Sequence, residues 1–113
     1  MKIIQLYSGN DQKSYFKEMD LTIKNQKELG RYSEKYPVTG MRFRESEVGE
    51  IFSWHTAPQP QYIIYLDGEV LVEASGGETR IFKAGDILFA TDLTGKGHIS
   101  RVLTKGRAIV VTI

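Results

Sequence analysis

The chain has 113 residues, the length of one domain with its own hydrophobic core. Fifteen Lys and Arg side chains against fourteen Asp and Glu leave a formal net charge of +1, which argues against electrostatic binding to nucleic acid or to an anionic membrane surface. There is no cysteine, which excludes disulfides, a thiolate nucleophile and Cys-ligated metal centres.

The first 37 residues predict two strands followed by a polar loop. Residues 2–7 form the first predicted strand, and the turn-forming residues 8–11 end it. Residues 18–23 alternate apolar and polar side chains, which indicates a half-buried strand, with a short helical turn at 14–19 as the alternative. Residues 24–36 have no firm period, so we interpret them as a surface loop with room for one helical turn.

Short strands follow one another at hairpin spacing from residue 38 to residue 113. They are separated by turns rich in glycine, proline and aspartate, and Gly76-Gly77 is a two-residue hairpin signal. The strands are expected at residues 41–44, 50–55, 61–66, 69–75, 78–82, 87–90, 98–103 and 107–113. This spacing, with almost no helical pattern, predicts one all-β domain, a sandwich or barrel.

Two sequence motifs lie between residues 49 and 101. The first is Gly-Glu-Ile-Phe-Ser-Trp-His at 49–55, followed by a proline loop and a glycine at Gly68. The second opens with Ala-Gly-Asp-Ile at 84–87 and ends at His98. Together they resemble the two motifs of the cupins, a family of jelly-roll β-barrels, and they cover about half of the chain.

Two shorter sequence runs make the resemblance more specific, because they point to a subgroup of the family. Trp-His-Thr-Ala-Pro at 54–58 and Asp-Leu-Thr-Gly-Lys-Gly-His at 92–98 are similar to runs in a subgroup of small, largely uncharacterised cupins. The resemblance implies a cupin-type double-stranded β-helix in a single domain, 1–113, with N-terminal strands and a loop at 1–37 and the barrel motifs at 38–113. It also implies that the two histidines point into the barrel mouth from facing sheets.

The resemblance further implies where a metal would be held. Many cupins use three histidines and one carboxylate, but here the second histidine falls on Ala57, or on Thr56 if the register shifts by one, and the carboxylate falls on Gln61. His55, Gln61 and His98 would then be the metal ligands, and the amide brings no negative charge to offset a divalent ion. We therefore expect no cofactor, with one divalent transition-metal ion as the alternative.

The same residues suit proton transfer without a metal. His55 and His98 are the only histidines, and imidazoles exchange protons near neutral pH. Lys96 could stabilise a developing enolate or carboxylate charge and completes the candidate catalytic set. Gly95 and Gly97 are expected to let this loop approach a ligand closely. The structural alternatives are a core histidine beside the tryptophan and a solvated loop lysine.

Further residues are candidates for binding the substrate. They are Gln61, Tyr65, Asp92 and Arg101. Gln61 and Tyr65 share one face of a strand, so if the amide points inward the phenol does too. Asp92 could orient an imidazole or serve only as a turn residue. Arg42 and Arg44 also share a face, and we expect that face to be the solvated outer one; if it points inward, these arginines and Arg101 present positive charge to an anionic substrate.

Three functions stay open at this point. The favoured one is a metal-independent lyase or isomerase that acts on a small oxygenated metabolite, and the alternatives are a divalent-metal cupin enzyme and a non-catalytic binding module. The expected partners are a small-molecule ligand and a second copy of the chain, because the strands at 2–7 and 107–113 would otherwise be exposed edges. Without a signal peptide or an apolar run long enough to span a membrane, we expect a cytoplasmic protein.

Overall fold

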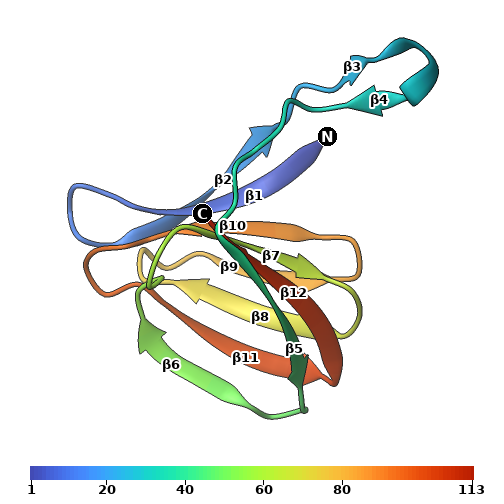
Figure 1. Cartoon of the computed structure of the whole chain (residues 1–113). Helices are drawn as coiled ribbons and strands as arrows, with labels where there is room; N and C mark the ends of the chain where they lie inside the picture. The colour runs from blue at the N-terminus through green and yellow to red at the C-terminus, as the bar shows by residue number, and fades with distance from the viewer.

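Short β-strands carry almost the whole fold (Figure 1). The computed structural model describes the backbone of residues 1–113 and every side chain except that of Lys27. The strands are β1 (Lys2–Ser8), β2 (Ser14–Asp20), β3 (Lys24–Asn25), β4 (Arg31–Tyr32), β5 (Gly40–Ser46), β6 (Ile51–His55), β7 (Gln61–Tyr65), β8 (Glu69–Ala74), β9 (Thr79–Lys83), β10 (Ile87–Thr91), β11 (His98–Thr104) and β12 (Gly106–Thr112). The helical content is the 3-10 turn η1 (Lys27–Leu29), and no helix in the described part of the chain could cross a membrane. The all-β prediction is confirmed.

The longer strands form two sheets around one core. The six-stranded sheet has the order β2-β1-β10-β7-β12-β5, and the four-stranded sheet has the order β6-β11-β8-β9. Neighbouring strands run antiparallel except β1 and β10, which are parallel. The core takes apolar side chains from both sheets, among them Leu6, Ile63, Tyr65, Val72, Phe82, Leu88 and Val102. Its strands alternate inward and outward side chains, which is why one face of each sheet is buried.

The second strand and the loop after it differ in detail from the prediction. β2 spans Ser14–Asp20, so both the strand expected at 18–23 and the helical turn considered at 14–19 are wrong. Its position is set by β1, which pairs with it residue for residue from Lys2 opposite Asp20 to Ser8 opposite Ser14. The segment predicted as a loop forms a small hairpin of β3 and β4 around η1, and this hairpin projects away from the two sheets as an arm (Figure 1).

Strand order also bears on the expected exposed edges. β1 lies between β2 and β10, and β12 lies between β7 and β5, so neither is an edge strand and that expectation is wrong. The edges of the large sheet are β2 and β5. On β5, Met41 and Phe43 are the exposed apolar side chains, and Phe43 is 75% exposed.

Candidate active site

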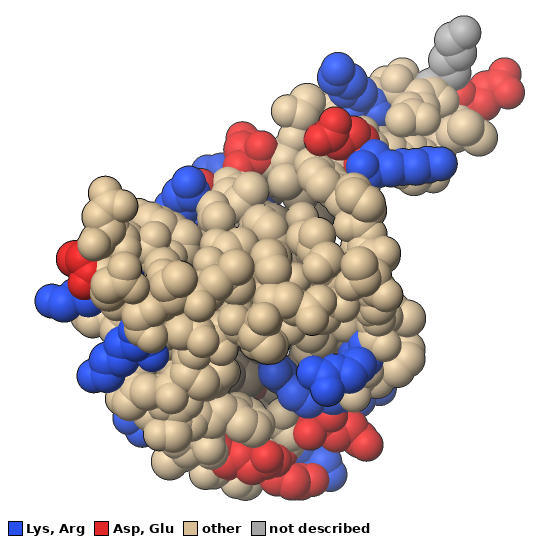
Figure 2. All heavy atoms as spheres, turned by 60° about the vertical axis from the view of Figure 1, so that its left-hand side comes forward, with Lys and Arg blue, Asp and Glu red and all other residues tan. Residues whose placement is uncertain are grey.

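A cavity of about 290 Å³ lies between the two sheets. Its walls come from six strands of the barrel, β5, β6, β7, β8, β10 and β11, and combine polar and apolar side chains. The lining residues are Arg44, Phe52, His55, Gln61, Ile63, Tyr65, Val70, Leu88, His98 and Ser100. Figure 2 shows a hollow in the surface with Lys and Arg side chains at its edge and Asp and Glu side chains just below it. This size is at the lower end for ligand pockets, so the cavity suits a small metabolite.

Strand β7 gives the cavity two polar ends. Gln61, Ile63 and Tyr65 all line it, as the alternation of side chains along a strand predicts. Gln61 lies at the histidine end, because residues 56–60 join His55 directly to it. Tyr65 lies at the other end of the strand, about 13 Å away at the usual rise per residue. The ladder places Arg44 at that second end, since Ala108 of β12 pairs with both Arg44 and Tyr65.

The two histidines are cross-strand neighbours. His98 of β11 pairs directly with His55 of β6, and the centroids of their rings are 4.4 Å apart. Both therefore come from the four-stranded sheet, and the expectation that they face each other from opposite sheets is wrong. The strands that carry the two motifs are hydrogen-bonded neighbours, so the imidazoles lie side by side on one wall of the cavity.

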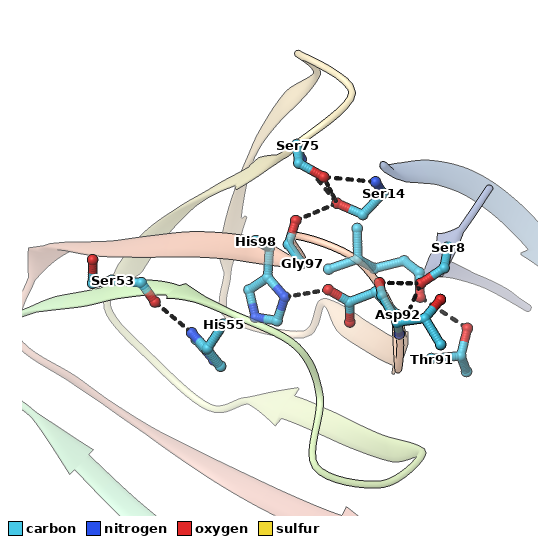
Figure 3. A network of polar contacts seen from close by, with 11 residues as sticks. Ser8, Ser14, Ser53, His55, Ser75, Thr91, Asp92, Gly97 and His98 are labelled. Atoms are coloured by element: carbon cyan, nitrogen blue, oxygen red, sulfur yellow. Dashed lines mark hydrogen bonds and ion pairs between the residues drawn. The ribbon is translucent and has the colours of Figure 1, made fainter. Parts of the chain in front are cut away.

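His98 is held by a buried carboxylate (Figure 3). Its Nδ1 lies 2.6 Å from Oδ2 of Asp92, and the two residues are 5% and 0% exposed. The loop after β10 places Asp92, whose backbone carbonyl accepts a hydrogen bond from the backbone N–H of Ala57 at 3.1 Å. A carboxylate only accepts, so Nδ1 of His98 donates and its Nε2 is the free basic atom. Asp92 thus has the orienting geometry that was one of its two predicted interpretations.

His55 is held in the same tautomer by different means. Its Nδ1 lies 2.6 Å from the backbone carbonyl oxygen of Ser53, which can only accept, so Nδ1 donates here too (Figure 3). The His55 side chain is exposed, whereas that of His98 is buried. One imidazole is therefore enclosed and oriented by a carboxylate, and the other stands at the mouth in contact with solvent.

Two glycines of the loop before β11 set this arrangement. Gly95 and Gly97 both have positive φ, +78° and +76°, where other residues are strained. A Cβ on Gly97 would overlap the backbone carbonyl of His55, and one on Gly95 would overlap that of Gln12. The close approach that these glycines permit is therefore to protein backbone rather than to a ligand. Gly97 brings the two histidine-bearing strands together.

Two predicted site residues lie outside the cavity lining. Nζ of Lys96 sits 4.3 Å from the ring centroid of Trp54, in a cation–π contact, and neither side chain lines the cavity. Arg101 follows Ser100 on β11, and it is Ser100 that lines the cavity. The structure therefore brings together His55, His98, Gln61, Tyr65 and, behind His98, Asp92, but not Lys96 or Arg101.

Arg44 was expected on a solvated outer face, and the structure places it inside the cavity instead. The outer face of β5 is the apolar one, with Met41 and Phe43 exposed on it. Nε of Arg44 is buried without a hydrogen-bond partner, and its guanidinium carbon lies 6.0 Å from the ring of Phe52. Burial raises the pKa of the Tyr65 phenol to about 12, an effect that the nearby Arg44 guanidinium opposes.

The donor atoms do not fit a resident divalent metal ion. The candidate ligands are Nε2 of His55, Nε2 of His98 and the buried, unpartnered Oε1 of Gln61, all of them neutral. Among the described side chains no group of three or more His, Cys, Asp or Glu is arranged to hold a metal. The Arg44 guanidinium adds a positive charge to the same cavity, which repels a cation. Gln61 is better placed to accept a hydrogen bond from a ligand hydroxyl.

Comparison with known proteins places the fold. No sequence profile of a known family and no curated protein sequence matches the chain. The putative ethanolamine utilization protein Q from Salmonella typhimurium LT2 matches with a TM-score of 0.53 at 19% identity, over 99% of this chain and 94% of that one. Protein NMB1881 from Neisseria meningitidis matches with a TM-score of 0.53 at 14% identity, over 83% and 82%. The epimerase RmlC from Legionella pneumophila, solved with dTDP-4-keto-L-rhamnose, has a TM-score of 0.49 at 15% identity, over 96% and 71%. The two matches with a TM-score of 0.53 show the fold alone at such low identities, and that fold is the cupin-type β-barrel that the sequence motifs imply.

Proposed function

We propose that the protein binds a small oxygenated metabolite in the cavity and catalyses proton transfer on it. It would act as a metal-independent lyase or isomerase with His98 as the base. The observation that supports this most directly is the buried contact between Asp92 and Nδ1 of His98. It fixes the imidazole as the tautomer whose Nε2 is basic, in a side chain that lines the cavity.

The proton-transfer step follows from this arrangement. Nε2 of His98 takes a proton from a carbon next to a carbonyl, the C–H electron pair moves onto the carbonyl as an enolate, and the Asp92 carboxylate stabilises the imidazolium that forms. Imidazolium at His55, whose ring lies 4.4 Å from that of His98, returns a proton to the enolate or protonates a leaving group. The first outcome is an isomerisation and the second an elimination.

Other residues hold the substrate during this step. Oε1 of Gln61 is buried without a partner and accepts a hydrogen bond from a substrate hydroxyl. The Tyr65 phenol is neutral in the physiological range, as a phenol ordinarily is, and burial raises its pKa further to about 12, so it donates a hydrogen bond. Lys96 takes no part in the proposal, since its ammonium group contacts Trp54 outside the cavity lining.

Hydrogen–deuterium exchange tests the proposal. Small hydroxy and keto compounds are incubated with the protein in D₂O, and loss of the proton signal next to the carbonyl is followed by NMR. Exchange should be catalysed by the wild type and by Lys83→Gln, an exposed control on β9, and abolished in His98→Gln. The rate should be unchanged by a chelator.

Two outcomes would contradict the proposal. A compound that binds but never exchanges would indicate a non-catalytic binding module. Near-stoichiometric transition metal in protein purified without a His-tag, together with chelator-sensitive exchange, would indicate a metal enzyme instead. Elemental analysis by mass spectrometry on the same sample separates these two results.

A further inference from the structure

Arg44 gives the cavity an uncompensated positive charge. It is the one Lys, Arg, Asp or Glu side chain that lines the cavity. Across the described side chains its guanidinium forms no ion pair, and its Nε is buried without a hydrogen-bond partner. The side chain is half-buried, but a buried N–H of a charged group without a partner is costly, and the cost is removed when an anion enters and accepts its hydrogen bond.

The surroundings of Arg44 favour a single negative charge of planar shape. Tyr65 adds a neutral phenolic donor beside the guanidinium, and the neighbouring wall is apolar, with Val70 and Phe52. One cation balances one carboxylate, and a guanidinium binds a carboxylate through two parallel hydrogen bonds. A single arginine would leave one of the two charges of a phosphate dianion unbalanced. The cavity also lies at the lower end of the range of about 300–1,000 Å³ that is usual for ligand pockets, which favours a small ligand.

The two polar ends of the cavity then divide the ligand between them. Arg44 and Tyr65 lie at one end of β7, and Gln61 with the two histidines lies at the other. Apolar side chains, Ile63 and Leu88 among them, line the space between the ends. A ligand that fills this space is charged at one end, apolar in the middle and oxygenated at the other end.

We propose that the cavity selects a short-chain monocarboxylate, with its carboxylate paired to Arg44 and its keto or hydroxy carbon beside His98. This assignment rests on the proposed function only where it places the keto or hydroxy carbon of the ligand beside His98. Recognition of the carboxylate rests on Arg44 alone and stands whether or not the ligand is turned over.

Binding of a matched pair of probes tests the assignment. The probes are 4-oxopentanoate and its neutral analogue 4-oxopentanamide, titrated into the protein by calorimetry at neutral pH. The wild type should bind the acid about ten-fold or more tightly than the amide, since the charge-assisted hydrogen bonds form only with the acid. Arg44→Gln should bind the two probes equally. Arg42→Gln removes an exposed arginine two residues away on the same strand and should keep the preference.

The wild-type comparison keeps the test decisive if Arg44→Gln does not fold. Equal affinity of the wild type for acid and amide, or no binding of either, would overturn the assignment, as would loss of the preference in Arg42→Gln. A preference for the acid without deuterium exchange would uphold carboxylate recognition and contradict the proposed proton transfer. Deuterium exchange by a wild type that binds acid and amide equally would uphold the proposed proton transfer and contradict carboxylate recognition by Arg44.

Discussion

The buried phenol of Tyr65 makes the stability of the protein fall steeply in alkaline solution. Tyr65 is 3% exposed, and burial raises its pKa from 10.0 to about 12. The unfolded chain therefore loses this proton near pH 10, whereas the folded protein keeps it to about pH 12. Because the folded pKa is the higher one, the contribution is complete below pH 10 and is lost as the pH rises toward 12. The rise in pKa corresponds to about 3 kcal/mol of unfolding free energy, about half of it lost by pH 11.

Urea denaturation of wild type and Tyr65→Phe at pH 8, 9, 10 and 11 measures this effect. Between pH 9 and pH 11 the unfolding free energy of the wild type should fall by about 1 kcal/mol more than that of Tyr65→Phe. The difference between the two slopes cancels the titration of lysines and of the other tyrosines. Tyr32→Phe, at a 53% exposed position, is the control and should keep the wild-type slope. Equal slopes for wild type and Tyr65→Phe would show that the phenol ionises as freely in the folded protein as in the unfolded chain.

Three further predictions concern the glycine loop before β11, the contact between Asp92 and His98, and the oligomeric state. Gly97→Ala should lower the unfolding free energy by about 3 kcal/mol or more, because the new Cβ would overlap backbone atoms at a residue with positive φ. The control Gly77→Ala meets no atom and should cost only the strain of its positive φ. Equal losses of unfolding free energy in the two variants would contradict this. Long-range ¹⁵N–¹H NMR should find the proton of neutral His98 on Nδ1, with a slowly exchanging signal that Asp92→Ala removes; a proton on Nε2 would refute the assigned tautomer. We propose a homodimer through the apolar outer face of β5, so light scattering should give twice the chain mass for wild type and less for Phe43→Ser, and a wild-type monomer would contradict it.

Local signals predicted most of the fold. The Gly76-Gly77 turn separates β8 from β9, and the predicted strands at 69–75 and 78–82 lie within one residue of those observed. β2 was misplaced because residues 18–23 have the alternation of a strand. Its actual position depends on full pairing with β1, which no short window of sequence shows.

The site was predictable where it depends on type and alternation of residues. The histidines are the only two in the chain, and Gln61 with Tyr65 follows the period of one strand. The inward position of Arg44 was weighed but not favoured, because alternation shows that Arg42 and Arg44 share a face without showing whether that face is inside. The usual rule that charged side chains face solvent holds for Arg42 and Glu45 of β5, which are exposed, and fails for Arg44.

The order in which strands pair has a consequence for how the protein folds during synthesis. β5 has only β12 as a neighbour, and β6, which carries His55, has only β11. These two strands must therefore wait for partners that are translated roughly 40 residues or more later, and contacts between such distant segments form slowly. Until then their edges are open to wrong pairing. The wall of the cavity that carries the two histidines is thus completed only after β11 has been made.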